Sequence, residues 1–137
     1  MSEVRLEFKQ TDLFPFEPEN QFMGTLNRVD GKNIVFLKGS PETILKKCSG
    51  IRVDGDIVEF NRDDILQAAK EFAEKGLRVM GMAYKEVDEQ FEKLDPHLTA
   101  GNFHFAGLQG MEDPIRPEAL EAIKIAKKAG IRVIMIT

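Results

Sequence analysis

The sequence predicts an α+β fold over about residues 1–108, followed by a short α/β segment. Two Asp-Gly pairs, each between runs of apolar residues, are typical of the tight turns of β-hairpins. Two other stretches begin with a helix-capping side chain and repeat apolar residues at helical spacing. Only after residue 116 does a helix pattern lead directly into a β-branched apolar strand, which is half of a parallel βαβ unit.

The alternation of apolar and polar side chains, together with the two turns, predicts where the strands lie. The turns are Asp30-Gly31 and Asp54-Gly55, where glycine takes a positive φ without strain. Residues 86–101 are charged and contain proline and glycine, so we expect a solvent-exposed excursion there. The expected strands are residues 4–8, 22–28, 33–38, both arms of the hairpin 51–60, 77–83 and 103–108.

The expected helices begin at side chains that can accept hydrogen bonds from free backbone amides. Ser40 precedes Pro41, which suits the first helical position, and we expect Gly50 to end this helix. Asn61 precedes a longer helix that Gly76 ends. Both helices carry apolar residues on one side, so we expect each to pack on a sheet.

The last part of the chain has a different character. Two prolines make residues 113–117 a stiff connector. We expect a helix over residues 117–129 and a buried-type strand over residues 131–137, where the chain stops. Because such a strand needs neighbours on both faces, we expect residues 109–137 to be the beginning of a further α/β unit.

Composition excludes several classes of function. The 137 residues include 19 Lys and Arg against 23 Asp and Glu, for a formal charge of −4, whereas nucleic-acid binders usually carry a basic patch. One cysteine leaves no internal disulfide and no cysteine-based zinc site. The sequence has no run of apolar residues long enough for a membrane span or a signal core. We therefore expect a soluble domain of a reducing compartment that binds no nucleic acid.

The end of the strand at 33–38 is the first candidate site. Lys38 and Gly39 follow this strand and directly precede the helix capped by Ser40. Unpaired amides at such a helix start favour an anion, Lys38 adds a full charge, and Gly39 lets a ligand approach the backbone. An ordinary capped turn with a surface lysine explains the same residues.

Two further side chains are candidates for ligand contact. Phe16 lies in a proline-flanked loop and offers a flat ring for stacking on a heterocycle. Spacing alone favours the alternative, a core residue that anchors the loop, because most large apolar residues are structural. Arg78 lies at the start of a buried-type strand, where a guanidinium needs a partner. That partner is either a ligand phosphate or a carboxylate of the chain.

Other reactive side chains point to no site. Asp54-Gly55-Asp56 has the spacing of an aspartate nucleophile, but the strand before it is short and contains an arginine, so a hairpin tip is favoured over a phosphatase. His97 and His104 have no second ligand at metal spacing, and Cys48 on a helix face suits packing. We therefore expect no metal site.

Five segments, in this order along the chain, resemble the cytoplasmic part of P-type cation-transporting ATPases of the calcium, sodium/potassium and proton-pump branches. The motif of lysine, glycine, a small residue, proline and glutamate is the most specific of them. The segments are Phe14-Pro15-Phe16 with Met23, Lys38-Gly39-Ser40-Pro41-Glu42, Gly76-Leu77-Arg78-Val79, Gly110 to Arg116 and Ala129 to Thr137.

The resemblance implies a domain organisation. Residues 1–108 would be part of a nucleotide-binding (N) domain, an antiparallel sheet flanked by helices. Residues 109–137 would be the hinge and the start of the second half of a haloacid-dehalogenase-like phosphorylation (P) domain. The parent would be a membrane protein with this part on the cytoplasmic side, transporting cations by hydrolysing ATP, with Mg²⁺, through a phospho-aspartate. Its partners would be ATP and the P, A and transmembrane domains.

The resemblance also implies roles for the candidate residues. Phe16 would stack on adenine, and Lys38 with Gly39 would line the pocket near the adenine and the phosphates. Arg78 would contact the phosphates. Each of these roles agrees with the chemistry of the residue itself: a platform, an anion-friendly strand end and a strand arginine.

The hinge and the C-terminus would supply two more contacts. Arg116 would approach the nucleotide, and Thr137 would hold the phosphoryl group of the phosphorylated aspartate. That aspartate and the acidic residue that reads adenine have no counterpart in this sequence. We therefore expect no catalytic residue here and an inactive chain when it is alone.

One departure from the family pattern opens an alternative. Gln21 stands where the family often has a lysine, so one cation near the phosphates is lost. A desolvated charge-assisted contact is worth roughly 1.5–3 kcal/mol. The alternative function is thus a structural or interaction module that keeps the fold and binds no nucleotide.

Overall fold

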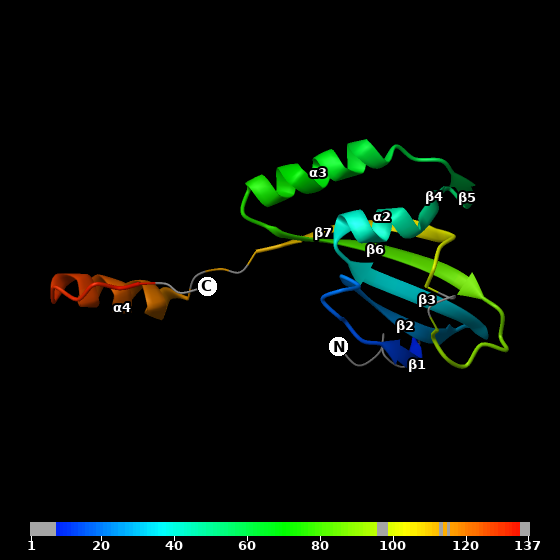
Figure 1. Cartoon of the computed structure of the whole chain (residues 1–137), viewed down its shortest axis with the longest axis horizontal. Helices are drawn as coiled ribbons and strands as arrows, with labels where there is room; N and C mark the ends of the chain where they lie inside the picture. The colour runs from blue at the N-terminus through cyan, green and yellow to red at the C-terminus, as the bar shows by residue number, and fades with distance from the viewer. Residues whose placement is uncertain (1–7, 96–98, 113, 115, 135–137) are drawn as a thin grey trace.

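The computed structural model describes residues 8–95, 99–112, 114 and 116–134. These residues form a seven-stranded sheet and three helices, with α2 and α3 on one side of the sheet and α4 near the end of the chain (Figure 1). The predicted α+β class is confirmed. The elements are β1 (Lys9–Phe14), β2 (Phe22–Val29), β3 (Lys32–Gly39), α2 (Pro41–Lys47), β4 (Cys48–Val53), β5 (Asp56–Val58), α3 (Arg62–Glu74), β6 (Arg78–Val87), β7 (Phe103–Met111) and α4 (Pro117–Lys128).

The strand order is β1-β2-β3-β6-β7-β4-β5. All neighbouring pairs are antiparallel except β4 and β7, which run parallel. The sheet is therefore mixed, and the expectation of an antiparallel sheet is corrected for this one pair. The reason lies in the crossing made by α2, which carries the chain past the places that β6 and β7 fill later. This crossing makes β4 run in the same direction as β3. The antiparallel pair β6–β7, inserted between them, makes β7 run in that direction too.

Both predicted hairpin turns are confirmed. Asp30 and Gly31 have φ values of 49° and 82°, and Asp54 and Gly55 have φ values of 50° and 99°. Two successive positive φ values define the type I′ turn, whose twist matches the twist of the flanking strands. Local sequence therefore sets the register of β2 with β3 and of β4 with β5.

The helix caps are also as predicted, but α2 ends earlier than expected. The Ser40 Oγ accepts from the Thr43 amide at 3.3 Å, and the Asn61 Oδ1 accepts from the Asp63 amide at 3.0 Å. Gly50 does not end α2, because Cys48 already begins β4. Gly50 instead lies inside the strand, where a Cβ would come within 2.6 Å of a side-chain carbon of Ile57.

The first strand and the stretch after β6 differ from the predictions. Residues 4–7 lie outside the described residues, and the first described strand is β1, whose polar residues hid it from pattern analysis. β6 and β7 both extend beyond their expected ends, to Val87 and Met111. The stretch after β6 is more than a solvated excursion. The side-chain amide of Asn33 donates to three backbone carbonyls of the stretch after β6, at 2.8 to 3.4 Å. Thr99, which also follows β6, is only 3% exposed.

The C-terminal part forms its helix but not its strand. α4 spans Pro117–Lys128, and Gly130 follows it with a φ of 75°. Residues 131–134 are exposed and irregular, because no described strand lies beside them to complete a ladder. Residues 113, 115 and 135–137 lie outside the described residues. Figure 1 shows α4 beyond the end of β7, away from the sheet.

The sheet has a covered face and an open face. The covered face packs against α2 and α3, as at Gly81, where an added Cβ would contact Pro41 and Ile44 at 3.2 Å. The open face carries no helix among the described residues (Figure 1). Its half-buried or exposed side chains include Met23, Thr25, Phe36, Lys38, Arg78, Met80, Met82 and Tyr84. The buried core residues are Phe22, Leu26, Val35, Leu37, Ile44, Leu45, Cys48, Ala83, Phe103 and Phe105.

Candidate functional site

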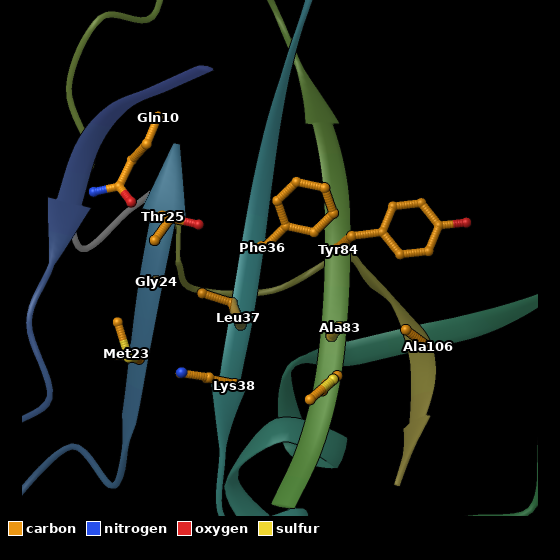
Figure 2. A pocket seen from close by; sticks show the side chains of 11 residues that line it. Gln10, Met23, Gly24, Thr25, Phe36, Leu37, Lys38, Ala83, Tyr84 and Ala106 are labelled. Carbon is orange, nitrogen blue, oxygen red and sulfur yellow. The ribbon is translucent and has the colours of Figure 1, made fainter. Parts of the chain in front are cut away.

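Two adjoining hollows lie on the open face. We name them the Phe16 hollow, of about 510 Å³, and the Lys38 hollow, of about 520 Å³. Both volumes are in the usual range of small-molecule sites. The Phe16 hollow is lined by Phe16, Gln21, Gly39, Ser40, Arg78, Val79, Met80 and Met111. The Lys38 hollow is lined by Gln10, Met23, Gly24, Thr25, Phe36, Leu37, Lys38, Met82, Ala83, Tyr84 and Ala106 (Figure 2).

Strand register places Lys38 between two methionines. Lys38 on β3 lies opposite Met23 on β2 and opposite Met82 on β6. Residues two apart on a strand share a face, so Met80 follows Met82 on the same face toward Arg78. Figure 2 shows the Lys38 and Met23 side chains next to each other on neighbouring strands. The cation thus lies on an apolar floor.

Gly39 lines the Phe16 hollow, next in sequence to Lys38 of the other hollow, and close packing of the backbone requires a glycine here. A Cβ at this position would lie 2.6 Å from the Cβ of Phe22, a distance that real side chains do not adopt. The next residue, Ser40, donates its amide to the Gln21 carbonyl at 3.0 Å. β2 and β3 therefore approach closely here, which brings the loop that carries Phe16 to the end of β3.

Phe16 is a surface residue, 58% exposed. The alternative that it anchors the loop in the core is therefore wrong. The loop is held by its own backbone, since the amides of Asn20 and Gln21 both donate to the Glu17 carbonyl, at 3.0 and 2.9 Å. An exposed ring on a fixed loop at the rim of a hollow is suited to stacking on a planar ligand.

The two cations of the hollows are available to a ligand. Arg78 is the first residue of β6 and pairs with Met111 of β7. Within residues 8–95, 99–112, 114 and 116–134, neither Arg78 nor Lys38 forms a salt bridge. The internal ion pair considered for Arg78 is therefore not formed among these residues. Both charges are free to bind an anion.

Gln21 has a role that the sequence analysis did not assign. It adopts a φ of 58°, and its Oε1 accepts hydrogen bonds from the Thr43 hydroxyl at 3.2 Å and the Ser40 hydroxyl at 3.5 Å. Gln21 thus links the start of β2 to the first turn of α2. The methionines Met80 and Met111 were also missed, although the period of two along β6 would have placed Met80 beside Arg78.

The chain is similar in sequence to proteins of one known family. Residues 1–118 match the family described as P-type ATPase, cytoplasmic domain N. The chain is 40% identical over 127 residues to the cation-transporting ATPase pma1 of Synechocystis sp., covering 92% of this chain and 14% of that protein. It is 39% identical to calcium-transporting ATPase 1 of Lactococcus lactis, covering 90% and 14%. It is 33% identical to calcium-transporting ATPase PAT1 of Dictyostelium discoideum, covering 99% and 12%.

The chain belongs to the P-type cation-transporting ATPase family. The resemblance drawn from the five segments is thereby confirmed. The chain spans about 14% of the length of the first two of these relatives. In the part that the structure describes, no helix is both long and apolar enough to cross a bilayer.

Two residues that the P-type ATPase resemblance singled out are not part of the hollows. Arg116 is exposed and immediately precedes α4, apart from the sheet, so the structure does not bring it to Phe16 or Arg78. Thr137 lies outside the described residues. The four candidates at the hollows are therefore Phe16, Lys38, Gly39 and Arg78.

Most of the remaining reactive side chains contribute to the structure of the fold. Burial raises the pKa of the Cys48 thiol to about 11, and its Sγ donates to the Ile44 carbonyl at 3.2 Å. Asp54 is at a hairpin tip, and His104 lies edge-on to Tyr84 with ring centroids 5.6 Å apart. His97 lies outside the described residues. The described residues hold no cluster of three or more His, Cys, Asp or Glu that could bind a metal.

Proposed function

We propose that this chain supplies the adenine-nucleotide pocket of a P-type cation pump, and that the two hollows of the open face are that pocket. The main observation that supports this proposal is that one hollow is lined by three candidate residues that are far apart in the sequence, namely Phe16, Gly39 and Arg78. Lys38 lines the adjoining one. The names of the relatives, cation- and calcium-transporting ATPases, support the assignment.

Each residue would have a distinct role toward ATP. The Phe16 ring would stack on adenine, a contact worth about 0.5–1.5 kcal/mol beyond area burial. The planar guanidinium of Arg78 would bind phosphate oxygens in pairs, and Lys38 would add a point charge. Gly39 would let the nucleotide approach the strand end. Mg²⁺ would be held mainly by the phosphates, as is usual for this ion.

The chain would position the nucleotide and leave the reaction to other domains. Phosphoryl transfer depends on positioning and on charge stabilisation, and the hollows offer the first. In the intact pump, ATP held here would phosphorylate an aspartate of the P domain and so drive cation transport across the membrane. Residues 1–108 would then be part of the N domain, and residues 109–137 the hinge and the start of the next P-domain segment. The A and transmembrane domains would complete the pump.

A second function has one observation in its favour. Gln21 brings no charge, and its side-chain oxygen is already occupied by two hydroxyl groups of Ser40 and Thr43. Of the described residues, Lys38 and Arg78 are then the only cations that line the hollows. A module that keeps the N-domain fold for contact with other domains, without binding nucleotide by itself, is the alternative.

A nuclear magnetic resonance titration separates the two functions. The chain is titrated with ATP and then AMP, each with and without Mg²⁺. Shifts that cluster at Phe16, Lys38, Gly39 and Arg78 and are similar for ATP and AMP support an adenine pocket. A folded sample with no shifts at millimolar nucleotide supports the module.

Paired variants test the assignment of each residue. Phe16→Ala is expected to weaken binding, while Phe16→Tyr keeps the ring and is expected to retain it. Lys46→Ala is the control for Lys38, because Lys46 is an exposed lysine at the far end of α2. If Phe16→Ala and Lys38→Ala both bind nucleotide as the unmodified chain does, the site is wrongly assigned.

A further inference from the structure

The methionines of the described residues all face the same two hollows. The sequence has 6 methionines, of which Met1 and Met135 lie outside the described residues. The other four are on three strands that are distant in the sequence, and each is half-buried. They line the Lys38 hollow or the Phe16 hollow: Met23, Met80, Met82 and Met111.

These methionines lie directly beside the two cations. Lys38 has Met23 across one strand boundary and Met82 across the other. Arg78 lies opposite Met111 in the β6–β7 ladder. A thioether is a weak hydrogen-bond acceptor, so in the reduced state these side chains form an apolar floor and leave both cations to a ligand.

We infer that these four methionines, here named the methionine cluster, are an oxidation site that regulates ligand binding at the open face. The oxidant is of the peroxide class. With hydrogen peroxide, the O–O bond breaks, one oxygen atom forms the S=O bond of methionine sulfoxide, and the other leaves as water. The sulfur loses two electrons and the peroxide gains them. Methionine sulfoxide reductases reverse the change at the expense of a dithiol, which becomes a disulfide with release of water.

Oxidation would act on the cations as well as on the floor. A sulfoxide oxygen is a strong acceptor within reach of Lys38 and Arg78, so it competes with an anionic ligand for both charges. It also turns a flexible apolar side chain into a polar one, which disrupts methionine-rich contact surfaces. The effect on ATP rests on the proposed function, whereas the effect on the two cations does not.

The single cysteine is not a competing sensor. Cys48 is 2% exposed and its Sγ is engaged with the Ile44 carbonyl. Oxidation of cysteine proceeds through the thiolate and requires access. The half-buried thioethers of the methionine cluster are therefore the accessible sulfur groups of the described residues.

The test compares peroxide-treated protein with untreated protein. Sulfoxides are located by peptide mass spectrometry, the fold is checked by circular dichroism, and ATP binding is measured by magnetic resonance titration. We expect oxidised protein to bind ATP roughly tenfold or more weakly, as loss of apolar contact and capture of a cation together imply. Treatment with both methionine sulfoxide reductases and a dithiol is expected to restore the original affinity.

A matched variant isolates the methionine cluster. In Met23→Leu/Met80→Leu/Met82→Leu/Met111→Leu, volume is nearly conserved, while Met1 and Met135 stay oxidisable. The ATP affinity of this variant before peroxide treatment is its own baseline, and the variant is expected to keep that affinity after treatment. The double variant Met23→Leu/Met82→Leu, which protects only the flanks of Lys38, is used if the quadruple variant does not fold. It is expected to lose less affinity on oxidation than the unmodified protein.

The outcomes separate this inference from the proposed function. If the reduced protein does not bind ATP, the proposed function fails, and the inference is judged without ligand from the Lys38 and Arg78 resonances. These are expected to shift on oxidation in the unmodified protein and to stay unchanged in the leucine variant. Unchanged resonances in both proteins overturn the inference. Equal loss of ATP binding in both proteins also overturns it, because Met1, Met135 or Cys48 would then be responsible.

Discussion

On the covered face of the sheet, the ammonium groups of Lys47 and Lys85 donate to the carbonyls of Thr99 and Gly101, at 2.7 and 3.0 Å. Each also lies over an aromatic ring, with 4.3 and 4.6 Å to the centroids. On the open face, Lys38 and Arg78 form no hydrogen bond or ion pair with any described residue. The cations of the covered face hold the backbone at Thr99 and Gly101, whereas those of the open face have no such partner among the described residues.

The difference shows how one set of strands supports two tasks. Side chains alternate between the faces of a strand, so a residue's place in this alternation decides whether it packs in the core or faces the proposed binding surface. Substitutions on the covered face should therefore change the free energy of unfolding with little effect on ligand affinity. Substitutions on the open face should do the reverse.

The largest effect on the free energy of unfolding is expected when two phenylalanines, one buried and one exposed, are each replaced by alanine. Phe103, which is 0% exposed, is in the core, and Phe16 is mostly exposed. Phe103→Ala is expected to lower the free energy of unfolding by about 3–5 kcal/mol, and Phe16→Ala by less than about 0.5 kcal/mol. Urea denaturation followed by circular dichroism measures both. A comparable loss of unfolding free energy in the two variants would contradict the different contributions of the two faces to stability.

A pH dependence distinguishes the buried groups of the covered face. Burial raises the pKa of Cys48 from 9.0 to about 11, so between these values the unfolded chain has already lost a proton that the folded chain keeps. Stability is then expected to fall as pH rises through this window, by on the order of 2 kcal/mol.

The two lysines of the covered face act in the opposite direction. Desolvation lowers the pKa of Lys47 and of Lys85 below 10.5, so in the window below 10.5 the unfolded chain binds more protons and stability rises with pH. Cys48→Ala should remove the fall of stability with pH that the thiol causes, and leave the rise of stability with pH that the two lysines cause. Urea denaturation at several pH values from 8 to 11 checks this, and a slope unaffected by Cys48→Ala would refute the assignment to the thiol.

Two glycines provide a sharper test of close packing at the site. Gly39→Ala is expected to cost about 1–3 kcal/mol, because its Cβ would collide with Phe22. Gly101→Ala is the control, since nothing lies within 4 Å of a Cβ there. Thermal unfolding of both variants measures the difference. Equal melting temperatures would mean that β2 and β3 do not approach closely at Gly39.

The smallest effects, on the affinity for ATP, are expected from removing a single cation of the open face. Lys38→Ala and Arg78→Ala are each expected to weaken ATP binding roughly two- to fivefold, as partly exposed charge contacts of up to about 1 kcal/mol do. Lys47→Ala is expected to leave affinity unchanged while lowering stability. Isothermal titration calorimetry with ATP gives the affinities. Loss of affinity in Lys47→Ala at unchanged stability would reverse the roles of the two faces.

Features that depend on neighbouring residues were predictable from the sequence. The two Asp-Gly turns and the caps at Ser40 and Asn61 are local, and each forms as expected. Features that depend on distant residues were not predictable. The parallel pairing of β4 with β7, the polar edge strand β1 and the hydrogen bonds that Lys47 and Lys85 donate to Thr99 and Gly101 all depend on contacts across the fold.

The candidate site follows the same rule. Motif resemblance selected Phe16, Lys38, Gly39 and Arg78 one at a time, but only strand order brings them together. β3 and β6 are adjacent in the sheet although two strands and two helices separate them along the chain. Gln21 was noticed as a missing charge, and its hydrogen bonds to α2 became visible only once β2 and α2 were placed side by side.

The strand order has a consequence for synthesis on the ribosome. β6 and β7 lie in the interior of the sheet, between β3 and β4, yet they are the last of its seven described strands to be made. Until they emerge, β1-β2-β3 and β4-β5 are separate hairpin units with unpaired inner edges, which are prone to pair with other chains. Arg78 is the first residue of β6, so the strand that joins the two units also carries the second cation of the proposed pocket. A nascent chain would therefore acquire the proposed binding surface only when its sheet closes.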